Sequence, residues 1–390
     1  MTNNITVIEF SPSGIKLLVG YVYENNVYIL DKREINNIEI DDNGFINKNV
    51  AVEGLKNLLS SSENYLKTKL TNFVIILPPD DFVTKEDSLS TYLSTNVITC
   101  QAYKNVAHSL SVQLCKDDSA LANLVNVYVH PNSFKVDSND WVKEFPLNKM
   151  AERFSLDAYG QFISKLTYDY YIESIIKSSC NISPYLSLVS PYAISVYISG
   201  FKNAPSPLFI LQLENNHNYS SYSKDGVLLK SQSSLIGIDE AIKKTALKYS
   251  LSIERTKQII TQFGLNEDKY PYITDEGIKL FEIQKTFKDS LDVFDDVFGK
   301  IDEIDPSHTV PLILFGKSIM EIDGIINALG DRYSRKISVF NNKVIGARDK
   351  EFASLVGAIK ISSFPYMIDK EENQIKEQNE QFSRSQYRRG

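Results

Sequence analysis

The segment Ile5-Thr-Val-Ile-Glu9-Phe-Ser11-Pro-Ser13-Gly14-Ile-Lys16-Leu-Leu-Val-Gly20 decides the fold class of this chain. An apolar run, a short polar turn and a second apolar run predict two strands joined by a tight turn. A later segment repeats this plan: Leu208-Phe-Ile-Leu-Gln212-Leu-Glu214-Asn-Asn-His217-Asn-Tyr219-Ser-Ser-Tyr-Ser-Lys-Asp225-Gly226. The sequence therefore predicts two halves that are built alike.

The segments around these two turns predict an α/β fold with mixed sheets. Residues 73–77 form an apolar run before two prolines, which is typical of a strand buried on both faces, and residues 50–70 before it have helical spacing. In the second half, we expect helices over 238–249 and 252–263, with Gly264 as a stop signal. These helices are followed by one helical stripe over 278–298, a buried strand at 311–315 and helices at 319–329 and 350–361.

Residues 81–165 predict a small α+β insert between the two halves. We expect a hairpin in which His130-Pro131-Asn132 forms the turn, and a further strand at 154–163. The single tryptophan, Trp141, is expected in a loop of this insert.

Composition limits the classes of function that this chain can have. With 390 residues and 43% hydrophobic residues, it is long enough for two or more packed units. Its formal net charge of −7 argues against nucleic acid as a partner. Three scattered cysteines indicate a reducing compartment, and we expect neither a secretory signal nor a membrane-spanning segment.

The two turns resemble the phosphate turns of the actin and sugar-kinase superfamily, written Asp-Ile-Gly-Thr-Ser and Asp-Ile-Gly-Gly-Gly-Thr-Thr-Asp. Within that superfamily, the order of the segments resembles FtsA, an actin-like bacterial cell division family. Residues 9–20 match its Asp-Ile-Gly-Thr-Ser-Lys-Ile-Lys-Ala-Leu-Ile-Gly without gaps. The insert after Pro79 stands where FtsA has its own SHS2 subdomain, and residues 129–137 resemble the hairpin of that subdomain. The resemblance covers roughly residues 5–365 and implies an actin-like ATPase fold, with two related halves around a cleft.

The resemblance also implies a division of the chain into domains. Residues 1–80 and 166–204 would form the first actin-like half, with a closing helix at 346–365, and residues 81–165 the insert. Residues 205–238 and 306–345 would form the second half, and residues 239–305 a helical subdomain. Residues 366–390 are polar and charged, which predicts a disordered tail.

The positions that bind the nucleotide in the family carry unsuitable residues here. They are Glu9, Ser11, Ser13, Gln212, Asn215, Asn216, His217 and Gly316. The glycines that let backbone approach a phosphate are lost, Pro12 lacks an N–H group, and Glu214 adds a like charge. We therefore expect no catalytic residues, little or no ATPase activity, and ATP with Mg²⁺ only as a doubtful ligand.

Individual residues leave alternatives open. Glu9 either holds Mg²⁺ in a weak ATP site or is a strand-end carboxylate that faces solvent, and the second is commoner. His217 beside Glu214 suggests acid–base chemistry, but without a third partner it is more often part of a polar turn. The histidines and cysteines do not cluster at the spacing of metal ligands, so no metal site is expected.

The resemblance implies a cell division adaptor that links FtsZ filaments to the cytoplasmic face of the membrane at the division site. The C-terminal peptide of FtsZ would bind the helical subdomain, and self-association into filaments is a further expectation. Basic candidates for the peptide site are Lys244, Lys248, Arg255, Lys257, Lys285 and Lys288, although such residues often only solvate a helix face. The alternatives are a divergent ATPase or small-molecule kinase, and a segregation or pilus-type actin homologue.

The last stretch, residues 369–390, does not resemble the amphipathic anchor with which FtsA proteins usually end. Its only bulky apolar residues are Ile375, Phe382 and Tyr387, and acidic residues fill its first half. Its arginines would add about 1 kcal/mol each near an anionic surface, which is too little for anchoring. We expect membrane contact to be weak or indirect.

Overall fold

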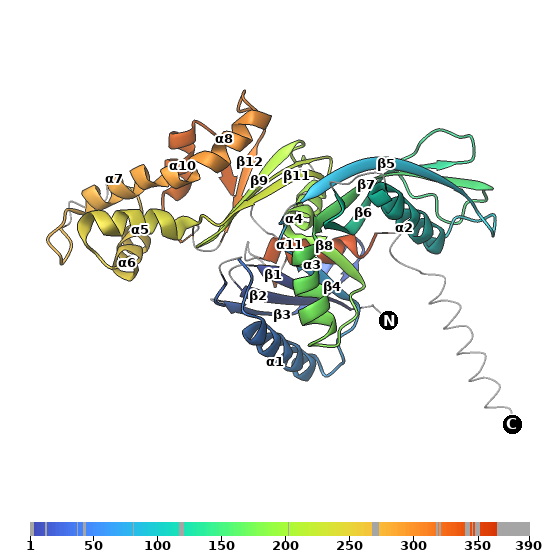
Figure 1. Cartoon of the computed structure of the whole chain (residues 1–390), viewed down its shortest axis with the longest axis horizontal. Coiled ribbons are helices and arrows are strands. Elements are labelled where there is room, and N and C mark those ends of the chain that lie inside the picture. The colour runs from blue at the N-terminus through green and yellow to red at the C-terminus, as the bar shows by residue number, and fades with distance from the viewer. Residues whose placement is uncertain are drawn as a thin grey trace. The chain divides into compact units, whose positions relative to one another are not determined.

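The structure is a computed structural model. It describes residues 4–364, apart from residues 12–13, 37, 42–43, 81, 117–120, 202, 267–272, 317–318, 320, 340–343, 345 and 348–351. The chain divides into two compact units. One comprises residues 1–83 and 163–359, and the other comprises residues 84–162 with the residues from 360 onward. Figure 1 labels most of their helices and strands.

The first unit begins with a five-stranded sheet of order β3-β2-β1-β4-β8. Strands β1 (Ile5–Ser11), β2 (Gly14–Tyr23) and β3 (Asn26–Asn36) form an antiparallel meander. Strand β4 (Phe73–Leu77) lies parallel to β1, and β8 (Leu186–Val189) lies parallel to β4. All of β1 and most of β4 are buried, which explains their continuous apolar runs.

A second sheet in the same unit repeats this topology, with the order β11-β10-β9-β12-β13. Here β9 (Leu208–Leu213), β10 (Asn218–Lys224) and β11 (Val227–Ser234) form the meander. Strands β12 (Leu312–Phe315) and β13 (Ile337–Val339) add in parallel beside β9. This repetition confirms an α/β fold with two related halves.

The helices of the first half are α1 (Lys48–Leu66), α3 (Lys165–Tyr168), the π-helix η2 (Asp169–Lys177), α4 (Ser190–Ser199) and α11 (Ala353–Ile361). Helix α1 begins at Asn47, whose side-chain oxygen accepts hydrogen bonds from the backbone N–H groups of Asn49 and Val50. Helix α4 is buried along nearly its whole length, which fits its apolar sequence.

The second half contains α5 (Ile238–Tyr249), α6 (Ile253–Phe263), α7 (Leu280–Ser290), the 3₁₀-helix η4 (Leu291–Phe294), α8 (Asp295–Ile304) and α10 (Ile325–Tyr333). One buried apolar cluster joins these helices to β9 and β12. The predicted stop at Gly264 is confirmed, because α6 ends there. The stripe predicted over 278–298 is confirmed, because its apolar residues are buried, and η4 divides it between α7 and α8.

The second unit has the order strand, helix, strand, strand: β5 (Val83–Tyr92), α2 (Cys100–Lys116), β6 (Leu124–Val136) and β7 (Arg153–Ser164). Its sheet has the order β5-β7-β6. The hairpin predicted at His130-Pro131-Asn132 is wrong, because β6 runs through these residues without a turn. Strand β6 lies at a sheet edge, where a proline is tolerated because its missing N–H group need not join a second ladder.

Two sequence expectations concern membranes and the tail. Among the described residues, no helix is both long enough and apolar enough to cross a bilayer. The tail from residue 366 onward lies outside the described residues, so its predicted disorder stays a prediction.

Candidate functional site

The first candidate phosphate turn joins β1 to β2, where Ser11 pairs with Gly14. The Ser11 hydroxyl donates a hydrogen bond to the backbone oxygen of Gly14 at 3.3 Å. The hydroxyl is therefore used within the turn itself. Ser13, the other candidate here, lies outside the described residues together with Pro12.

Glu9 is buried in this half of the molecule, which corrects the expectation that its carboxylate faces solvent. Its residue exposure is only 2%. Ser354, from the start of α11, donates a hydrogen bond to Glu9 Oε1 at 2.6 Å, and Lys16 Nζ lies 3.9 Å from Oε2. Glu9 and Lys16 are also opposite each other in the β1–β2 pair. The carboxylate is thus held by an ammonium and a hydroxyl of the protein.

The second candidate turn joins β9 to β10 and includes the buried side chains of Gln212 and Glu214. The Gln212 amide donates to Glu214 Oε1 at 3.3 Å, and the Ser190 hydroxyl donates to Gln212 Oε1 at 3.1 Å. Ser190 is the first residue of α4. This chain of hydrogen bonds fills, with side chains, a turn that would need bare backbone to bind a phosphate.

The backbone of the same turn closes the start of α5. The N–H group of Ile238 donates to the Glu214 oxygen at 3.0 Å, and that of Asp239 donates to the Asn215 oxygen at 2.8 Å. Gly237 makes this approach feasible, since a Cβ at its position would lie 2.2 Å from the Asn215 oxygen. Free N–H groups at the start of a helix can bind a phosphate, but these two groups already donate to oxygens of the turn.

Asn215, Asn216 and His217 complete the second turn. Lys257 Nζ lies 3.5 Å from Asn215 Oδ1, and His217 Nδ1 lies 2.9 Å from Asn216 Oδ1. His217 is 3% exposed, and burial lowers its pKa to about 4, so the ring is neutral at pH 7. Its backbone oxygen accepts from the Glu214 N–H group, which places the residue in the closed turn.

Three carboxylates act on one buried phenol near these turns. The pKa of Tyr219 is raised far above its usual value by burial and by the charges of Asp80, Glu214 and Glu9, together with Tyr171. Such a concentration of negative charge disfavours a bound phosphate. Among the described residues, no group of three or more His, Cys, Asp or Glu side chains is arranged to hold a metal ion.

Gly316 directly follows β12 and lies against the end of β9. Its φ is +134°, and a Cβ there would be 1.8 Å from the Leu213 oxygen, so only glycine fits. The structure therefore brings Gly316 close to the second turn. The next two residues of this loop lie outside the described residues.

The basic candidates of the helical region make contacts within the protein. Lys244 pairs with Asp292 at 2.9 Å, Lys248 donates to Thr286 at 2.9 Å, Arg255 pairs with Glu276 and Asp275, and Lys257 lies 3.5 Å from Asp239. Lys285 is exposed and Lys288 is half-buried on α7. Their role in binding a partner stays a prediction.

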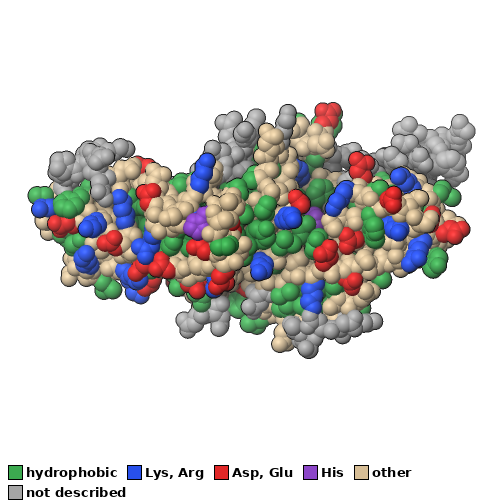
Figure 2. Space-filling view, turned by 90° about the horizontal axis from the view of Figure 1, so that it is seen from above, with side chains coloured by type: hydrophobic (Ala, Val, Ile, Leu, Met, Phe, Trp, Pro, Cys, Tyr) green, Lys and Arg blue, Asp and Glu red, His purple; other side chains and the backbone are tan. Residues whose placement is uncertain are grey.

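Exposed apolar side chains on the same helices were missed by the sequence reasoning, which selected cations. Leu247 is 72% exposed at the end of α5 and Phe281 is 48% exposed at the start of α7, and Ile253 and Ile273 are also exposed. The Tyr249 hydroxyl donates to the Glu282 oxygen at 2.9 Å, so these ends of α5 and α7 lie together. Figure 2 shows hydrophobic and basic side chains gathered at its left end, over the helices labelled α5 to α7 in Figure 1. In the sequence, these residues could have been recognised as apolar positions that fall outside the buried stripe of each helix.

Comparisons with known proteins bear on the fold. No model of a protein family matches the chain, and no curated protein sequence matches it. Among solved structures, the PilM-PilN type IV pilus biogenesis complex is similar at 10% identity with a TM-score of 0.55, covering 91% of this chain and 97% of that chain. A diol dehydratase-reactivating factor in nucleotide-free form is similar at 9% identity with a TM-score of 0.50, covering 92% and 99%.

MreB5 of Spiroplasma citri bound to ADP is similar at 10% identity with a TM-score of 0.48, covering 93% of this chain and 96% of that chain. At such low identity these similarities concern the fold alone. The narrower resemblance to FtsA stays a prediction. The repeated topology and the structural similarities show that this chain has an actin-like ATPase fold.

Proposed function

We propose that this protein is a non-catalytic adaptor of cell division, which links FtsZ filaments to the cytoplasmic face of the membrane at the division site. One observation carries the non-catalytic part: the buried, hydrogen-bonded side chains of Gln212 and Glu214 stand at the second turn, where a phosphate would need bare backbone. An actin-like fold that hydrolysed ATP would need this kind of turn free for phosphate. The adaptor part rests on the sequence resemblance to FtsA.

Charge supports the same conclusion. Glu9 already has Lys16 and Ser354 as partners, and Glu214 is held by Gln212. A triphosphate at this place would meet these carboxylates and Asp80 in a poorly solvated site, where repulsion between like charges is strong. Hydrolysis also needs a positioned metal ion and water. We expect ATP turnover by the purified chain to be indistinguishable from a blank without protein.

The partner site in this proposal is the exposed apolar surface at the ends of α5 and α7. FtsZ tails are generally short segments that mix apolar and acidic groups. Leu247 and Phe281 offer apolar area, and exposed Lys285 and Lys279, which lies 5.9 Å from the centre of the Phe281 ring, offer positive charge. A peptide with both features fits such a surface, because pockets give specificity and cations orient the acidic groups.

The experiment is a titration of the purified chain with the C-terminal peptide of FtsZ. Loss of one buried large apolar side chain costs about 1.5–3 kcal/mol, so Phe281→Ser should weaken binding roughly 10- to 100-fold. Tyr65→Ser is the matched control, since Tyr65 is an exposed aromatic residue on α1. Equal affinity for both variants would place the site elsewhere. No binding by the unmodified chain would reject FtsZ as the partner.

A pilus-type assembly adaptor is the second candidate, and the similarity to the PilM-PilN complex favours it. Both candidates predict a protein without turnover that binds another protein's segment, and both are compatible with self-association. They differ in the partner. Capture of FtsZ by the immobilised chain, abolished by Phe281→Ser, would support the first candidate. Capture of a type IV pilus biogenesis protein without FtsZ would support the second.

A further inference from the structure

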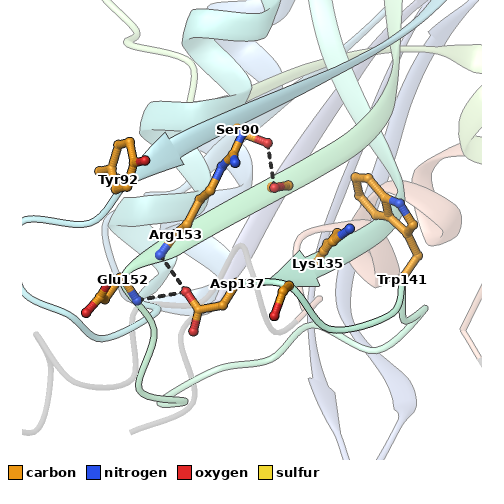
Figure 3. A pocket seen from close by; sticks show the side chains of 9 residues that line it. Ser90, Tyr92, Lys135, Asp137, Trp141, Glu152 and Arg153 are labelled. Atoms are coloured by element: carbon orange, nitrogen blue, oxygen red, sulfur yellow. Dashed lines mark hydrogen bonds between the residues drawn. The ribbon is translucent and has the colours of Figure 1, made fainter.

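The second unit contains a pocket of about 710 Å³ on its three-stranded sheet. A volume of about 300–1,000 Å³ is usual for sites that bind small molecules. Figure 3 shows the lining of the pocket: Ser90 and Tyr92 from β5, Lys135 from β6, Arg153 and Ser155 from β7, and Asp137, Ser138, Trp141 and Glu152 from the connecting segments.

The pocket lies on the sheet face opposite α2. Gly160 of β7 faces that helix, because a Cβ there would lie 2.7 Å from a methyl group of Leu114. Residues of the other parity in β7, such as Arg153 and Ser155, point to the opposite face. On that face the hydroxyls of Ser90 and Ser155 are 2.6 Å apart and join β5 to β7. The floor of the pocket is therefore separate from the apolar core of the unit.

Backbone hydrogen bonds place Tyr92 and Asp137 on either side of Arg153. The N–H group of Leu93 donates to the Glu152 oxygen at 2.9 Å, and that of Asp137 donates to the Arg153 oxygen at 2.9 Å. Neighbouring strands are about 4.8 Å apart, so the ends of β5 and β6 are about 10 Å apart across β7. One planar ring cannot contact both ends.

Two aromatic side chains lie at opposite ends of the pocket, with two cations between them (Figure 3). Tyr92 on β5 is 80% exposed, and Trp141, which follows β6, is 44% exposed. The cations are Arg153 and Lys135, and Lys135 Nζ lies 6.0 Å from the centre of the Trp141 ring. A ligand that contacts both ends therefore needs two rings with negative charge between them.

The two cations can receive an anion. Among the residues that the structure describes, neither Arg153 nor Lys135 forms an ion pair with a carboxylate. A guanidinium group binds a phosphate through two parallel hydrogen bonds, and an ammonium group adds a second positive charge. Two linked phosphates, each with one negative charge, match these two cations.

Asp137 and Glu152 add negative charge to the lining. Asp137 Oδ1 accepts hydrogen bonds from the backbone N–H groups of Glu152 at 3.0 Å and Arg153 at 2.8 Å, which stabilise its charge and fix its position. In Figure 3 both carboxyl groups lie on the same side of the line from Tyr92 to Trp141. Carboxylates in nucleotide sites accept hydrogen bonds from ribose hydroxyls. These two groups therefore fit the sugars of a ligand and not its phosphates.

We propose that this pocket binds a pyrophosphate-linked dinucleotide. Its two bases stack on Tyr92 and Trp141, and its pyrophosphate lies on Arg153 and Lys135. Ribose hydroxyls donate to Asp137 and to the second carboxylate on the same side. Each aromatic and charged side chain of the lining then has a partner of matching chemistry. The inference goes beyond the proposed function and does not depend on it.

Smaller and larger nucleotides fit the pocket less well. A mononucleotide has one base and leaves one of the two rings without a partner. A longer nucleic acid would bring further phosphates towards the two carboxylates, in a chain whose formal net charge is −7. The lining thus favours a ligand with two bases and only two phosphates.

Trp141 is the only tryptophan of the chain, so its fluorescence in the full-length protein reports on the pocket. Diadenosine pyrophosphate should quench this fluorescence saturably, and should bind about 10-fold or more tightly than ADP, because a second base stacks. Cyclic di-AMP has two bases but lacks adjacent free hydroxyls on its riboses, and should bind more weakly. Equal affinity for ADP and diadenosine pyrophosphate, or tighter binding of cyclic di-AMP, would overturn the proposal.

Two pairs of variants test the contacts. Tyr92→Ser keeps the reporter tryptophan and should weaken the binding of diadenosine pyrophosphate to the level of ADP, whereas Tyr65→Ser, on α1, should not change it. Arg153→Gln should weaken binding about 10-fold or more. Its control is Lys149→Gln, which removes an exposed cation of the same unit outside the lining. Equal affinities for a pocket variant and its control would overturn the proposal.

Other occupants of the pocket would give different results. Quenching by a single-stranded oligoribonucleotide but not by diadenosine pyrophosphate would assign this sheet face to RNA. Quenching by neither would show that the two rings do not receive bases. Either result would overturn the proposal, and far-ultraviolet circular dichroism establishes that each protein used is folded.

Discussion

The two turns of this molecule occupy equivalent places in two sheets of the same topology, yet they are closed by different means. In the first half, the buried Glu9 is held by side chains: Lys16 on the neighbouring strand and Ser354, which is 345 positions away in sequence. In the second half, backbone oxygens of the turn close the start of α5, which follows in the same half of the chain. The comparison teaches that one framework can close its two equivalent turns either by an internal ion pair or by its own main chain.

The largest expected effect comes from breaking the ion pair of the first half. Lys16→Met keeps the apolar stem but removes the ammonium beside Glu9, whose side chain is 3% exposed. Removing one partner of a buried pair destabilises a protein by about 3–5 kcal/mol. Denaturant unfolding of the variant should show a loss of this size.

The control for this prediction removes the charge on the other side as well. Glu9→Gln in the Lys16→Met background leaves no buried charge at this pair, and we expect it to recover most of the lost stability. A loss below about 1 kcal/mol in Lys16→Met alone would show that the pair does not hold the first half together.

In the second half, we expect the burial of His217 to make folding stability depend on acid pH. The pKa of His217 is lowered to about 4 in the folded protein, against 6.5 for an ordinary histidine, because burial disfavours its charged form. The unfolded chain therefore binds a proton between pH 6.5 and 4 that the folded chain does not. Stability falls as pH falls through this window, by about 3 kcal/mol for this residue.

His217→Gln should remove that share of the acid dependence. Unfolding free energies measured at pH 7 and pH 4 give the comparison, and the difference between the two pH values should shrink in the variant. His130 in the second unit, whose pKa burial also lowers to about 4, is unchanged in this variant, so its own contribution to the acid dependence should remain. An unchanged pH dependence in His217→Gln would contradict the closed turn.

The smallest expected effects come from single hydroxyls in the two halves. Ser354→Ala removes a hydrogen bond to the charged Glu9, which is worth about 1.5–3 kcal/mol. Ser190→Ala removes a hydrogen bond to the neutral Gln212, which is worth about 0.5–1.5 kcal/mol. Thermal unfolding of both variants should rank them in this order. The reverse order would mean that the second turn depends more on side chains than its backbone contacts indicate.

The sequence predicted the sheets of both halves because their signals are local. Continuous apolar runs and polar turns were sufficient to locate β1, β2, β9, β10 and β12. The hairpin at Pro131 was wrong, because a proline normally indicates a turn and only the position of β6 at the sheet edge removes that constraint. Tertiary context decided the outcome at this position.

The candidate site was predictable as a set of positions, but its chemistry was not. The resemblance of the two sequence motifs to the phosphate turns of the superfamily identified Glu9 and Gln212 as residues of the two turns. It could not show that Glu9 is buried, because its partner Ser354 comes from the other end of the described chain. Likewise, Lys244 and Lys248 follow a helical spacing that suggests an exposed basic face, while their partners lie on η4 and α7. Such pairings arise only when the helices pack.

The position of β5 beside β7 has a consequence for the order of folding. These strands begin and end the second unit, so pairing them brings residues 83 and 163 together. Strands β4 and β8, which flank this stretch of sequence, must meet across a long intervening chain. If the second unit folds first, the effective loop between them shortens roughly threefold, and the entropic cost of closing it falls by about 1 kcal/mol. The folded insertion would then hold the two chain segments close together and speed formation of the parallel part of the first sheet.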